Sequence, residues 1–126
     1  MKKILFCILS AALFFIACTP QQTVNENLNG TWNESLYNGD PLPSGTSTII
    51  KFVKSGDVNG TYTITSTSKG STTTNSGTYT IANELTITLI NSDKNVSSIV
   101  FTIYARSKTA LSLQDSQGIL WNFEKQ

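Results

Sequence analysis

The chain has 126 residues, with nine Lys or Arg against eight Asp or Glu and no histidine, so its formal charge at neutral pH is +1. The absence of histidine excludes Ser–His–Asp triads and His–carboxylate metal sites, and two cysteines are too few for a Cys-rich zinc module or a disulfide framework. A near-neutral charge gives no electrostatic basis for nucleic-acid binding. We therefore expect no metal, no cofactor and no nucleic-acid partner.

The N-terminus is organised as an export signal. Lys2 and Lys3 precede an almost uninterrupted apolar run of fourteen residues, 4–17, which is shorter than the about 20 residues that a membrane-spanning helix needs. The run ends in residues 15–18, Phe-Ile-Ala-Cys, which resemble a bacterial lipobox. Residues 1–17 are therefore predicted to be a lipoprotein signal peptide. The alternatives are a signal peptide cut elsewhere or a cysteine packed in an uncleaved helix.

The lipobox resemblance implies that Cys18 is lipidated and becomes the first mature residue. Cleavage before it would leave 109 of the 126 residues, with a net charge of −1. Residues 18–27 would then be the lipidated cysteine and a flexible tether, because the segment after Cys18 is polar and shows no periodicity. Thr19 in place of aspartate resembles an outer-membrane sorting signal. We thus expect a cell-envelope protein whose partner is the outer membrane, held through its lipid.

The remaining residues, 28–126, alternate threonine with β-branched and aromatic residues, which predicts half-buried strands. Short turns rich in Gly, Asn, Asp and Ser separate the strands. Eight strands are expected, at 29–37, 46–54, 58–67, 71–82, 84–91, 96–106, 109–115 and 117–125. Short connections favour pairing of each strand with the next, and closing this meander buries its apolar rows. The predicted fold class is all-β, an eight-stranded antiparallel up-and-down barrel.

Several motifs support a family resemblance. Residues 28–32 read Leu-Asn-Gly-Thr-Trp, residues 60–63 and 77–80 both read Gly-Thr-Tyr-Thr, and residues 121–123 read Trp-Asn-Phe. Together they resemble the small lipocalin-like domains of bacterial lipoproteins over essentially the whole mature chain. The resemblance implies a barrel with a closed base, an open mouth and a lid-like loop after the first strand, here residues 38–45.

The same resemblance implies that Trp32 packs inside the base against a basic residue. Lys125, on the last strand, is closer in topology, whereas Arg106 is the better cation–π partner. We leave both open as base residues, together with the alternative that both are solvated.

Alternation along each strand assigns the side chains that face the interior, and it places Leu85 inside together with Ile87 and Leu89. Glu34 would also face inward, and we expect a β-bulge to turn it away, with a wet cavity in front of it as the alternative. Ile49, Val53, Val100 and Tyr104 fall on the outer face unless a strand takes the other register. The interior and mouth residues expected to bind a ligand are Leu36, Phe52, Tyr62, Tyr79, Phe101 and Trp121.

An eight-stranded barrel is either filled by side chains or holds one small ligand. The many large apolar residues on these strands favour a barrel mostly filled by side chains. We expect a non-enzymatic, membrane-anchored, lipocalin-like protein that binds a small apolar molecule if a cavity exists. The alternative is an envelope interaction module, such as a hydrolase inhibitor, that acts through loops 38–45 and 66–76. Without histidine or a free mature thiol, the chain offers few groups for catalysis.

Overall fold

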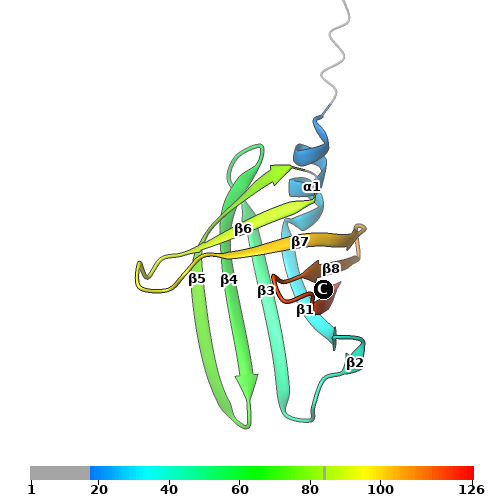
Figure 1. Ribbon diagram of the computed structural model, residues 1–126, viewed down its shortest axis with the longest axis vertical. Coiled ribbons are helices and arrows are strands. Elements are labelled where there is room, and N and C mark those ends of the chain that lie inside the picture. The colour runs from blue at the N-terminus through cyan, green and yellow to red at the C-terminus, as the bar shows by residue number, and fades with distance from the viewer. Residues whose placement is uncertain (1–17, 84) are drawn as a thin grey trace, which may run out of the picture.

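The computed structural model describes residues 18–83 and 85–126, which form a closed antiparallel barrel with a helix at one end (Figure 1). The predicted signal peptide lies outside the described residues. Within the described ranges, no helix has the length and apolar character needed to cross a bilayer. The elements in chain order are α1 (Pro20–Leu28), β1 (Gly30–Tyr37), β2 (Asp40–Pro41), β3 (Thr46–Lys54), β4 (Asn59–Ser68), β5 (Ser71–Asn83), β6 (Thr86–Asn91), β7 (Ile99–Arg106), β8 (Ala110–Gln114) and β9 (Leu120–Lys125).

The sheet is a meander that closes on itself. Apart from the short β2, each strand pairs with the next in sequence, and β1 also pairs with β9. β2 has two residues, and it pairs with the C-terminal end of β1, beyond the residues of β1 that pair with β3. The predicted eight-stranded up-and-down barrel is therefore confirmed, and every predicted strand overlaps an observed one.

The register follows the predicted alternation in most strands. On β3 and β4, Ile50 pairs with Ile64 and Phe52 pairs with Tyr62 on the inner face. Val53, Val100 and Tyr104 are exposed on the outer face. β3 and β7 therefore take the register predicted by alternation rather than the one shifted by a residue. Leu85, expected inside, is exposed because it precedes β6, next to a register shift between Ile81 and Asn83.

The expected flexible tether is wrong for most of its length, since residues 20–28 form α1. Thr19 caps the helix: its side chain accepts a hydrogen bond from the backbone of Gln22, whose own side chain accepts one from the Thr19 backbone. Pro20 stands at the first turn, where its missing N–H costs nothing. Val24 and Leu28, four residues apart, bury one face of the helix against the barrel.

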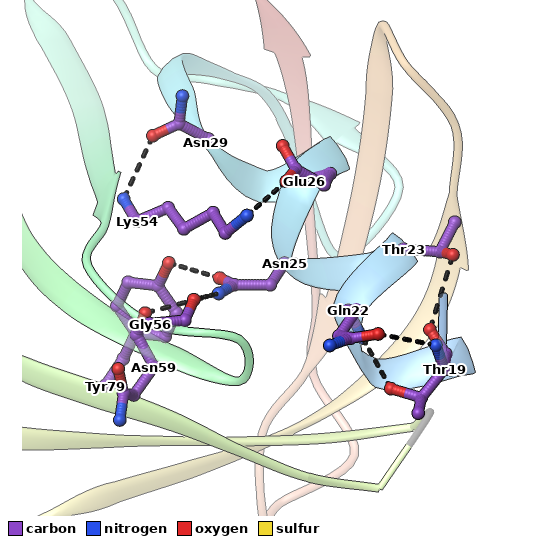
Figure 2. A network of polar contacts seen from close by, with 10 residues as sticks. All are labelled: Thr19, Gln22, Thr23, Asn25, Glu26, Asn29, Lys54, Gly56, Asn59 and Tyr79. Atoms are coloured by element: carbon purple, nitrogen blue, oxygen red, sulfur yellow. Dashed lines mark hydrogen bonds and ion pairs between the residues drawn. The ribbon is translucent and has the colours of Figure 1, made fainter. Parts of the chain in front are cut away.

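The helix is held to the barrel by a buried asparagine (Figure 2). Asn25 is fully buried; its amide donates to the carbonyl oxygens of Gly56 (2.8 Å) and Asn59 (3.2 Å) and accepts a hydrogen bond from the hydroxyl of Tyr79 at 2.5 Å. An ion pair between Glu26 and Lys54 flanks these contacts. The helix is therefore part of the barrel domain, whose boundary moves from residue 28 back to about residue 20.

Replacing Asn25 with alanine should destabilise the fold while leaving the helix sequence otherwise intact. The substitution removes the partner of the Tyr79 hydroxyl and the Asn25 donor to the Gly56 carbonyl, while the Asn59 carbonyl keeps the backbone N–H groups of Ser55 and Gly56. We expect the free energy of unfolding to fall by about 2–4 kcal/mol. Urea unfolding followed by circular dichroism measures the change. Asn27→Ala, at a half-buried asparagine on the same helix, is the matched control. Equal losses in the two variants would contradict the role of Asn25.

Candidate functional site

The half of the barrel next to α1 is filled. Trp32, Phe52 and Tyr79 are buried there, with the rings of Phe52 and Tyr79 edge-to-face at 5.2 Å. Each fully buried side chain of this kind contributes roughly 1.5–3 kcal/mol, so this half is a stabilising core. It leaves no room for a ligand.

The opposite half holds an open cavity of about 490 Å³, within the usual size range of small-molecule pockets. Its apolar walls come from β1, β3, β4, β7, β9 and the segment before β9, and consist of Tyr37, Ile50, Ile64, Ile99, Phe101, Ile119, Trp121 and Phe123. Its polar lining consists of Thr48, Ser66, Asn75, Asp115, Ser116 and Gln117. The expectation of a barrel mostly filled by side chains thus holds for one half only.

A β-bulge in β1 decides which aromatic groups enter the cavity. Glu34 pairs with Phe123, but two residues later Leu36 pairs with the outward Asn122 and Tyr37 with the inward Trp121. The extra residue flips the alternation, so Leu36, expected inside, lies on the outer face. In its place the ring of Tyr37 meets that of Trp121 edge-to-face at 4.8 Å.

Trp121 is fixed from its other side by Asp115. The Trp121 Nε1–H donates to Asp115 Oδ2 at 3.2 Å, while Asp115 Oδ1 accepts from the backbone N–H groups of Gln117 (2.9 Å) and Ile119 (3.0 Å). Burial alone would raise the pKa of Asp115, but the hydrogen bonds from Ile119, Trp121 and Gln117 outweigh it and lower the pKa. The mouth therefore carries an ionised carboxylate beside a positioned indole ring.

Glu34 places a second carboxyl group on the inner face. The bulge falls after Glu34, so the expectation that it would turn this residue away is wrong. Burial raises its pKa above the reference of 4.5, an effect that a hydrogen bond from Thr48 partly offsets. Its Oε1 atom is buried and has no hydrogen-bond partner within the described part of the chain. Its β9 partner Phe123 and its hydrogen-bond donor Thr48 both line the cavity, so Glu34 adjoins the lining without being part of it.

A sequence profile of the lipocalin-like domain family matches residues 28–113, more than half of the chain. The chain belongs to the lipocalin-like domain family. The family's match begins at the last residue of α1 and includes the motif around Trp32.

Solved structures share the fold. A lipocalin-like protein from Bacteroides uniformis has a TM-score of 0.59 at 24% identity, over 79% of this chain and 99% of that chain. An uncharacterized protein from Bacteroides eggerthii has a TM-score of 0.58 at 16% identity, over 79% and 99%. A redesigned β barrel has a TM-score of 0.57 at 16% identity, over 81% and 94%. A search of curated protein sequences finds no match.

The base of this lipocalin-like barrel uses Lys125 over Trp32. The Lys125 ammonium lies 5.1 Å from the centre of the Trp32 ring and donates to the Asn27 carbonyl at 3.0 Å, while the Trp32 indole N–H donates to the Leu28 carbonyl at 2.8 Å. Gly30 makes room for the lysine, because a Cβ there would lie 2.6 Å from Lys125 Cε. Arg106 borders the same packed region beside Trp32.

The residues expected to bind a ligand separate into three groups. Phe101 and Trp121 line the cavity. Phe52, Tyr62 and Tyr79 are buried in the core and do not line it. Leu36 lies on the outer face, and sequence reasoning missed Tyr37 because the inward charge of Glu34 indicates an irregularity in β1 without fixing its position. Among the described residues, no group of three or more His, Cys, Asp or Glu is placed to hold a metal ion.

Glu34→Gln should alter how stability depends on pH. Because the folded-state pKa of Glu34 is raised, its stabilising contribution is fully present below about pH 4.5 and is lost as pH rises through the folded-state value. We expect the wild type to lose stability relative to Glu34→Gln as pH rises from acid to neutral. Urea unfolding across this range measures the difference. The control is Glu124→Gln, at an exposed glutamate on β9; the same pH dependence in both variants would contradict burial of the Glu34 charge.

Proposed function

We propose that the protein is a non-enzymatic, lipid-anchored lipocalin-like protein that binds one small apolar molecule at the barrel mouth. The observation that carries this proposal is the uneven filling of the barrel. Side chains pack the base, whereas a cavity of about 490 Å³ with mainly apolar walls opens at the mouth. Such a cavity, with a few polar groups converging on it, is the usual form of a small-molecule site.

Binding rather than catalysis is supported by the chemistry of the chain. It has no histidine, and its described cysteine, Cys18, lies outside the cavity. The cavity wall instead offers shape, aromatic rings and fixed hydrogen-bond acceptors. The alternative of an interaction module has no comparable support, because Ser66 and Asn75 of the 66–76 segment belong to the cavity wall.

Two variants on neighbouring positions of β4 test the site. Ser66→Trp places a large ring in the cavity, whereas Thr65→Trp places it on the opposite face of the same strand. We expect the wild type and Thr65→Trp to bind the neutral fluorophore Nile red at one site per molecule, and Ser66→Trp to bind it at least about tenfold more weakly. Fluorescence titration measures the affinity, and thermal melting checks that both variants fold. No binding by the wild type, or equal binding by both variants, would contradict the proposal.

The lipid anchor would fix the direction in which the barrel mouth points relative to the membrane. Cys18 is exposed and directly precedes Thr19, the cap of α1, so no flexible spacer separates the proposed lipid from the docked helix. α1 lies at the base, and the β4–β5 hairpin points the opposite way (Figure 1). A lipid on Cys18, in the outer membrane by our proposal, would hold the base toward the bilayer and turn the mouth away from it.

Expression of the full chain in a bacterial host tests the anchor. We expect the wild type to sediment with membranes and to incorporate labelled palmitate, because two or more acyl chains anchor a protein stably. Cys18→Ser should lose the label and become soluble, while Cys7→Ser, within the predicted signal peptide, should keep it. Label in Cys18→Ser would refute lipidation at this residue.

A further inference from the structure

The cavity wall carries negative charge and no compensating positive charge. Asp115 is part of the lining, and none of the described residues in the lining is Lys or Arg. Lys69 and Lys94 lie on the β4–β5 and β6–β7 connections outside that lining, and Lys125 is bound to the base. A ligand in the cavity therefore meets the Asp115 carboxylate with no Lys or Arg among the described lining residues.

Asp115 stays ionised where the ligand would contact it. Its two oxygens accept hydrogen bonds from two backbone N–H groups and from the Trp121 indole, and these bonds lower its pKa. The same bonds hold the carboxylate in place, so it cannot swing away from an incoming group.

Glu34 is a second acceptor that adjoins the lining, next to Thr48 and Phe123. Its Oε1 is buried without a partner, although the surrounding wall is mostly apolar. A buried, unpartnered carboxylate oxygen is costly. A ligand that donates a hydrogen bond at this point would remove the cost, whereas a ligand carboxylate would add like-charge repulsion in a poorly solvated space.

We propose that the cavity accepts apolar molecules that carry an amine and discriminates against fatty acids and other carboxylates. This inference rests on the proposed ligand-binding function and specifies its chemical class. The apolar walls bury the hydrocarbon part, and Asp115 in the lining, together with Glu34 adjoining it, selects the head group.

Competition between matched ligands tests the selectivity. Dodecylamine, dodecanol and dodecanoate share one chain and differ in head group; each displaces Nile red from the full mature protein at concentrations below micelle formation. We expect dodecylamine to bind at least about tenfold more tightly than dodecanoate, the ratio expected for one charge-assisted hydrogen bond, with dodecanol between them. Glu34→Gln should reduce the ratio of the dodecylamine affinity to the dodecanoate affinity several-fold. Ser116→Lys, which adds a cation to the lining, should move the preference toward dodecanoate.

The outcomes separate the two proposals. Failure of Nile red and all three ligands to bind would overturn the ligand-binding function itself. Equal binding of the three ligands, or tighter binding of dodecanoate by the wild type, would leave ligand binding intact and overturn the amine preference. A ratio unchanged in both Glu34→Gln and Ser116→Lys would also overturn it, because the charge of the wall would then play no part.

Discussion

The buried contact between Asn25 and Tyr79 is the constraint on which the rest of the structure depends. It fixes α1 across one end of the barrel, so that Leu28 and the helix carbonyls hold Trp32 and Lys125 in place. The aromatic side chains of the base then fill the barrel up to about its middle. With one end sealed and filled, the cavity lined by inward side chains of the described strands lies at the other end, where it opens.

The strands were predictable because each depends on local alternation, and the alternation in this sequence is strong. The position of the bulge after Glu34 was not predictable from the sequence. The bulge lies where β1 stops pairing with β3 and continues to pair with β9. An inward charge at Glu34 was a valid warning of irregularity, but the shift acts one residue later. It therefore reverses the faces on which Leu36 and Tyr37 lie, whereas Glu34 stays on the inner face.

The helix shows a different limit of sequence reasoning. Its apolar face consists of Val24 and Leu28, which is too few residues for a detectable helical period. The Thr-x-x-Gln capping box that begins at Thr19 was a readable signal for it. The importance of Asn25 was not readable, because its partners lie more than thirty residues away in the chain.

The central claim is that the mouth half of the barrel is a ligand cavity and the base half is a core. Methyl NMR of isoleucines during a titration with Nile red tests it directly. The account predicts that signals of Ile64, Ile99 and Ile119, which line the cavity, shift on binding, while those of Ile81 and Ile87, buried in the core, stay unchanged. Shifts confined to Ile81 and Ile87, or spread over outward residues such as Ile90, would contradict it.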